Sequence, residues 1–219
     1  MKKNLSFVIF LVDRSGSMSS IAKDMIGGYN TYIKSQKDAN LGECKVFFYQ
    51  FNTAYETVYE NVDVNRVAEL TDETFVPRGG TALYCSLGKT IVDIGNKLSN
   101  LDESERPEKI LFITITDGQN NEVLYGKEYL VYTPAQIKEM ITHQTEKYGW
   151  DFVYIGANQN AWDVGNTMGI SGNTKLNYVA SAKGTSDMFN KLSKGTMSYR
   201  SAATKQAFAF APEEAEEKV

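Results

Sequence analysis

The chain has 219 residues, 42% of them hydrophobic and 23% charged. This is the composition of a soluble globular protein with a buried core. Its formal net charge of −4, without clustered Lys and Arg, argues against a nucleic-acid partner. The apolar run at residues 5–12 is short for a signal peptide and is cut off by Asp13 and Arg14. No stretch reaches membrane-spanning length, so we expect a cytoplasmic protein with no membrane partner.

Hydrophobic patterning predicts the secondary structure. Nearly continuous apolar runs indicate strands buried on both faces, and apolar residues three and four apart indicate helices. In chain order, the sequence predicts a strand at 5–12, a helix at 21–37 capped by Ser19 or Ser20, strands at 44–51 and 54–60, a helix at 82–98, a strand at 109–116, a helix at 134–148, a strand at 151–156, an edge strand at 175–180 and a helix at 185–203.

This alternation of strands and helices predicts an α/β fold. We expect a doubly wound, mostly parallel central sheet with helices on both faces. The strands at 44–51 and 54–60 meet across a two-residue turn and should form one antiparallel edge hairpin. We expect a single domain over residues 1–211, followed by an acidic, disordered tail at 212–219.

Few residues suit catalysis. The two cysteines, Cys44 and Cys85, fall in a predicted strand and a predicted helix, where buried thiols are the simplest interpretation. The single histidine, His143, lies on a predicted helix without other ligands around it. The sequence contains no recognisable set of nucleophile, acid and base, so we expect a protein that is not an enzyme.

Oxygen-bearing side chains gather where buried strands end. Asp13, Ser15 and Ser17 directly follow the first strand, and Asp117 follows the strand at 109–116. Alternate residues of an extended segment point the same way, and the carboxyl ends of parallel strands share one edge of a sheet. Thr81 lies in a glycine-rich turn before a helix. All five side chains offer the hard oxygen ligands that Mg²⁺, Mn²⁺ and Ca²⁺ prefer.

These motifs also carry a resemblance to a known family. Asp-x-Ser-x-Ser at 13–17, Gly-Thr at 80–81 and Thr-Asp-Gly at 116–118 resemble the metal-ion-dependent adhesion site (MIDAS) of von Willebrand factor A domains. Their order and strand context match over residues 5–118, and the remaining elements suit that fold to about residue 211. Residues 143–158 are similar to small bacterial or phage cytoplasmic members of the family.

The resemblance implies a function as well as a fold. It implies that Ser15, Ser17 and at times Thr81 touch one divalent cation directly, while Asp13 and Asp117 act largely through water. We expect Mg²⁺ at this site, with Mn²⁺ and Ca²⁺ as alternatives. The cation would bind an Asp or Glu of a partner protein, which makes the chain a metal-dependent protein-binding module.

Two further hypotheses concern the loops around the metal and an alternative function. Tyr84, Gln119, Asn120, Asn158 and Gln159 lie in loops that should surround the metal, where they would select the partner, although amides are also common in solvated loops. The alternative function is a metal-dependent hydrolase of the phosphatase type that uses Asp13. Such enzymes need a second carboxylate two residues later, and Ser15 occupies that position.

Overall fold

A computed structural model describes residues 1–126, 129–157, 161–170, 172–204 and 206–211. Its centre is a six-stranded sheet with the order β3-β2-β1-β4-β5-β6. The strands are β1 (Lys2–Asp13), β2 (Glu43–Phe51), β3 (Tyr55–Asp63), β4 (Pro107–Thr116), β5 (Asp151–Ala157) and β6 (Lys175–Tyr178). The expected strands are all present. Most of their ends lie one to three residues from the predicted position.

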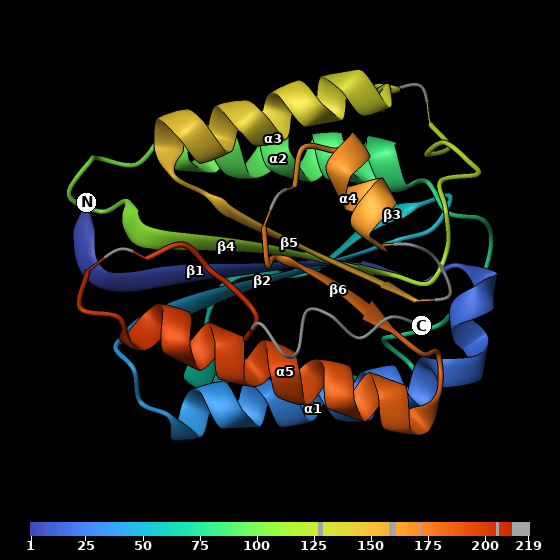
Figure 1. Cartoon of the computed structure of the whole chain (residues 1–219), viewed down its shortest axis with the longest axis horizontal. Coiled ribbons are helices and arrows are strands. Elements are labelled where there is room, and N and C mark those ends of the chain that lie inside the picture. Colours follow the sequence, from blue (N-terminus) through green and yellow to red (C-terminus); the bar gives the residue numbers. More distant parts are fainter. Residues whose placement is uncertain (127–128, 158–160, 171, 205, 212–219) are drawn as a thin grey trace.

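All neighbouring strands are parallel except β2 and β3, which form the expected antiparallel hairpin. The strand with the longest continuous apolar run, β1, lies between β2 and β4, where both of its faces are covered. Because β1, β4 and β5 are parallel, their last residues meet at one edge of the sheet, on the right of Figure 1. We call this the carboxyl edge, and the opposite one the amino edge.

Helices cover both faces of the sheet (Figure 1). One layer holds α2 (Leu83–Ser99), α3 (Pro134–Tyr148) and α4 (Ala161–Thr167), and the other holds α1 (Ala22–Asp38) and α5 (Ala182–Ser201). Each layer has its own apolar core against the sheet. The doubly wound α/β prediction is therefore confirmed.

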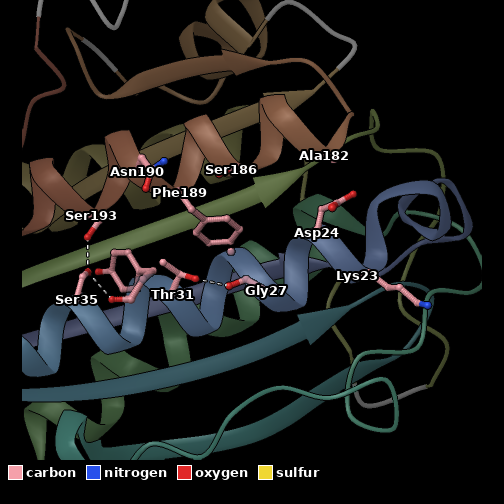
Figure 2. Close-up of a pocket in the computed structure, with 12 residues that line it drawn as sticks. Lys23, Asp24, Gly27, Thr31, Ser35, Ala182, Ser186, Phe189, Asn190 and Ser193 are labelled. Atoms are coloured by element: carbon pink, nitrogen blue, oxygen red, sulfur yellow. Dashed lines mark hydrogen bonds between the residues drawn. The ribbon is translucent and has the colours of Figure 1, made fainter.

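Close packing of α1 against α5 depends on a missing side chain. A Cβ atom at Gly28 would lie 2.2 Å from Cδ2 of Phe189, so only glycine lets this ring rest on α1 (Figure 2). The Ser35 and Ser193 hydroxyls are hydrogen-bonded between the same two helices. This contact fixes the C-terminal helix on the sheet.

The structure corrects the predicted cap of the first helix. Residues Gly16–Ile21 form a 3₁₀ helix, and α1 begins after Ile21 without a side-chain cap from Ser19 or Ser20. The short helix α4 was not predicted. Cys44 and Cys85 are buried free thiols, as expected. Over the described residues, every helix is too short or too polar to cross a membrane. Residues 212–219 lie outside the described part of the chain.

Candidate metal centre

Two carboxylates lie at the carboxyl edge, where β1 and β4 end. Asp13 is the last residue of β1 and is 0% exposed. Its Oδ1 accepts a hydrogen bond from the Ser15 backbone N–H at 2.7 Å, and its Oδ2 accepts one from the Thr116 hydroxyl at 2.6 Å. Asp117 directly follows Thr116 and is also buried. Pairing between β1 and β4 therefore brings together two acidic residues that are far apart in the sequence.

The serine hydroxyls link these strand ends. The Oγ atoms of Ser15 and Ser17 are 3.1 Å apart, and Ser17 Oγ donates to Asp117 Oδ1 at 2.7 Å. Ser15 is buried whereas Ser17 is exposed. The cluster is thus closed at its base and open to solvent at Ser17.

Thr81 completes the cluster from the turn before α2. A Cβ atom at Gly118 would lie 3.4 Å from Thr81 Oγ1 and 4.0 Å from Ser17 Oγ, which places both hydroxyls beside this glycine. Asn121 holds the turn in place, because its Oδ1 accepts from Thr81 N–H at 2.8 Å while its own N–H donates to Thr81 O at 3.1 Å. All five predicted site residues therefore lie together.

Backbone contacts set the shape of the loop at residues 13–17. Arg14 N–H donates to Phe51 O at 2.8 Å, and Gly16 N–H donates to Gly79 O at 2.9 Å. Gly79 has a φ of +73°, a conformation that favours glycine. Met18, which is fully buried, anchors the following 3₁₀ helix in the core. The loop is fixed by the rest of the fold, so its hydroxyls are positioned in advance.

The two carboxylates lack a counter-charge within the described residues. Burial raises the pKa of Asp13 to about 6, although hydrogen bonds from Thr116 and Ser15 oppose the shift. Burial also raises the pKa of Asp117. The adjacent guanidinium of Arg14 does not compensate them, because its Nη1 pairs with Glu56 Oε2 on β3 at 2.6 Å. A buried carboxylate without a cation is costly.

The donor set fits a hard divalent cation. It consists of three hydroxyl oxygens and two carboxylates, whose uncompensated negative charge a cation would balance. Among the described residues, no group of three or more His, Cys, Asp and Glu side chains is arranged to hold a metal ion. Any metal at this edge would therefore depend on the serine and threonine oxygens.

The predicted rim is only partly described. Tyr84, Gln119 and Asn120 belong to the segments that carry Thr81 and Asp117, whereas positions 158 and 159 (Asn158 and Gln159) are outside the described residues. Asn120 Oδ1 accepts from Tyr84 N–H at 3.1 Å, so this oxygen caps the start of α2. Its amide oxygen is thus already occupied by a contact within the chain.

Sequence reasoning missed two residues that position the site. Thr116 orients the Asp13 carboxylate, and Asn121 orients Thr81. Thr116 could have been found, because it belongs to the same Thr-Asp-Gly motif as Asp117. Asn121 gave no signal, since it is one of several amides in a polar loop.

Solved structures resemble this chain in fold, although no protein-family model and no curated protein matches the sequence. Proximal thread matrix protein 1 from the mussel byssus has a TM-score of 0.56 and 15% identity, over 88% of this chain and 46% of that one. The pilus adhesin SpaC from Lactobacillus rhamnosus GG has a TM-score of 0.63 and 14% identity, over 90% of this chain and 30% of that one. A von Willebrand factor type A protein from Catenulispora acidiphila has a TM-score of 0.55 and 14% identity, over 88% of this chain and 42% of that one.

The chain spans less than half of the length of each of these proteins. A further structure of the mussel protein, with a TM-score of 0.53 and 16% identity over 88% of this chain and 46% of that one, has zinc in its MIDAS motif. The strand order, the two helical layers and these likenesses agree on one conclusion: the chain has the von Willebrand factor A fold.

Proposed function

We propose that the chain is a metal-dependent protein-binding module that captures an acidic side chain of a partner protein. Asp13, Ser15, Ser17, Thr81 and Asp117 would hold one divalent cation, which we propose to be Mg²⁺. The observation that carries the proposal is the pair of buried carboxylates that lack a counter-charge in the described part of the chain, linked by hydroxyls that reach solvent at Ser17. Zinc in the MIDAS motif of a protein with the same fold supports it.

The chemistry of these side chains explains why a carboxylate would be the ligand. Hydroxyl oxygens are neutral and would leave the charge of the cation uncompensated. The carboxylate of Asp13 is buried, and both of its oxygens already accept hydrogen bonds, from Ser15 and Thr116. A cation on the hydroxyls would keep affinity for another anionic oxygen. The open side at Ser17 is the direction from which a partner's Asp or Glu would approach.

The alternative of a phosphatase-type hydrolase has less support. Its general acid or base would stand two residues after Asp13, where the structure places the Ser15 hydroxyl against Ser17. The only histidine, His143, belongs to α3 and lines a groove that also includes the start of β4, at the amino edge. Both observations favour binding over catalysis.

Affinity capture tests the proposal. Immobilised protein is exposed to an extract of its native cells in Mg²⁺ or in EDTA, beside the variant Asp13→Asn. We expect a partner that is retained in Mg²⁺ only and only by the wild type. Amidation of carboxyl groups in the extract with a carbodiimide and glycinamide should abolish capture. Retention in EDTA, or of the amidated partner, would contradict the proposal, and hydrolysis of nitrophenyl phosphate that is lost in Asp13→Asn would favour the enzyme.

A further inference from the structure

The chain that follows α5 turns back along the sheet toward the carboxyl edge. Phe208 N–H donates to Oδ1 of Asp151, the first residue of β5, at 3.0 Å. Phe210 N–H donates to Asn173 O, just before β6, at 2.7 Å. Strand β5 runs from the amino edge to the carboxyl edge, and residues 208–210 follow the same direction, as the red segment after α5 does in Figure 1.

Two buried aromatic side chains fix this segment. Phe208 and Phe210 are 2% and 1% exposed, and their rings pack edge to face with centroids 5.1 Å apart. Gly195 of α5 makes room for them, because a Cβ atom there would lie 2.8 Å from Phe208 Cζ. The chain is therefore anchored to the sheet directly before residues 212–219.

The sequence that follows this anchor is acidic. Positions 212–219 read Pro-Glu-Glu-Ala-Glu-Glu-Lys-Val. A carboxylate is the ligand that the proposed cation at the carboxyl edge would take. In the metal-free protein, the negative charges of Asp13 and Asp117 would repel these glutamates, and a bound divalent cation would remove the repulsion. Any contact between the acidic segment and the site would thus depend on the metal.

The register of the sheet gives the distance that these glutamates must cover. Asn173, which the segment contacts, lies near the level of the second residue of β5. Pairing across the sheet places Asp13 about four residues farther along the strands and three strands away. At about 3.3 Å per residue and about 4.8 Å per strand, the straight line is roughly 20 Å. From position 210, the chain spans at most about 14 Å as far as Glu214, but about 20 to 25 Å as far as Glu216 and Glu217.

The end of β6 lies close to the candidate metal centre. Burial raises the pKa of Tyr178, the last residue of β6, and the charges of Asp117 and Asp13 raise it further. Because such interactions weaken with distance, the acidic segment has only a short way to pass beyond β6.

From the direction, reach and charge of this segment we propose that the pair Glu216 and Glu217 supplies a carboxylate to the cation of the same chain, and that a partner must displace it. The inference rests on the proposed metal-dependent capture and adds regulation of that site. A carboxylate tethered by a few residues acts at an effective concentration in the millimolar range. A partner that offers a single carboxylate would compete poorly, so capture would need further contacts.

Replacement of the glutamates in pairs tests the inference on the full chain. In Glu216→Gln with Glu217→Gln, Mg²⁺ should bind roughly threefold to tenfold more weakly in calorimetry, because the cation loses a ligand. Propionate, which has the end of a glutamate side chain, should bind the Mg²⁺-loaded variant more tightly by the same factor, because its competitor is gone. The matched control, Glu213→Gln with Glu214→Gln, removes the same charge nearer to the anchor and should behave as the wild type does.

Paramagnetic Mn²⁺ shows where the segment lies, because it broadens the NMR signals of nearby nuclei. The amide signals of Glu216 and Glu217 should broaden in the wild type but not in Ser15→Ala with Ser17→Ala, and dilution should leave the broadening unchanged.

The possible failures separate this inference from the metal centre itself. Equal Mg²⁺ and propionate binding by the wild type and both glutamate pairs, or equal changes in both pairs, would overturn the inference and leave the metal centre intact. A Mg²⁺-dependent dimer that needs Glu216 and Glu217 would also overturn it, because the carboxylate would then come from a second copy. Absence of Mg²⁺ binding to the wild type would overturn both the inference and the proposed function.

Discussion

Charged side chains have different surroundings at the two edges of the sheet. At the amino edge, the buried Lys109 ammonium donates to three backbone carbonyls at the end of α5, at 2.7 to 3.0 Å. Asp151, at the start of β5, accepts from the Tyr199 hydroxyl at 2.8 Å and from Phe208 N–H at 3.0 Å. Each of these charged groups has several hydrogen-bond partners within the chain.

At the carboxyl edge, Asp13 and Asp117 are hydrogen-bonded, yet none of the ion pairs among the described residues includes either of them. Lys109 is in none of these ion pairs either, so the edges differ in another respect. At the carboxyl edge two carboxylates share one hydrogen-bonded cluster, and the charge of Asp117 adds to burial in raising the pKa of Asp13. A cation at the carboxyl edge would balance these two like charges, whereas the single ammonium at the amino edge already donates to three carbonyl oxygens.

The largest effect is expected at the amino edge. Lys109→Met should lower the free energy of unfolding by roughly 3–5 kcal/mol, because three carbonyl groups lose their donor. The loss should be equal in Mg²⁺ and in EDTA, as measured by urea denaturation. A loss that depends on the metal would mean that the two edges are coupled.

Removal of a charge at the carboxyl edge should raise the free energy of unfolding of the metal-free protein rather than lower it. Because burial raises the pKa of Asp13 to about 6 from 3.8, the metal-free protein should become more stable as the pH falls through 6 toward 4. The total gain is up to about 3 kcal/mol. Asp13→Asn should remove this pH dependence and, in EDTA at pH 8, should be at least as stable as the wild type. A large loss of stability there would show that the carboxylate is already compensated without metal.

Metal should stabilise the wild type through the carboxyl edge alone. At a hundredfold excess over its dissociation constant, Mg²⁺ should add about 2.7 kcal/mol to the free energy of unfolding. The double substitution of Ser15→Ala with Ser17→Ala should erase this gain. The exposed neighbours Ser19→Ala with Ser20→Ala form the matched control and should retain it. Equal gains in both double variants would remove the serines from the site.

The smallest expected effect is that of Thr81→Val on stability, and it shows whether Thr81 is a metal ligand or a structural residue at the start of α2. Thr81→Val keeps the shape of the side chain and removes its oxygen, so Mg²⁺ affinity should fall while stability in EDTA changes by less than about 0.5 kcal/mol. Asn120→Ala removes the observed cap of α2 and should cost about 0.5–2 kcal/mol with Mg²⁺ affinity unchanged. The reverse pattern in calorimetry and melting would make Thr81 a structural residue.

Much of the fold was predictable because the strands are long and apolar. The buried strands β1, β4 and β5 need no distant partner to be recognised, and Pro134 at its first position marks the start of α3. The 3₁₀ helix after Ser15 was not predictable, because contacts of Gly16 and Met18 with distant residues set it. The helix α4 is only seven residues long, which is too short for a clear period.

The residues of the candidate site were predictable from the sequence, but the residue that holds Thr81 in place was not. Asp13, Ser15, Ser17 and Asp117 follow strands whose parallel pairing could be inferred. The role of Asn121 depends on how the loop after β4 folds back to Thr81, which local sequence does not determine.

The most direct test of the metal centre is a calorimetric titration of EDTA-stripped protein with Mg²⁺ and Mn²⁺. We predict one ion per chain for the wild type and for the amino-edge variant His143→Ala. Binding should be lost in Asp13→Asn and in the double variant of Ser15 and Ser17. Absence of saturable binding to the wild type, or equal binding by all four proteins, would contradict the metal centre and the function that depends on it.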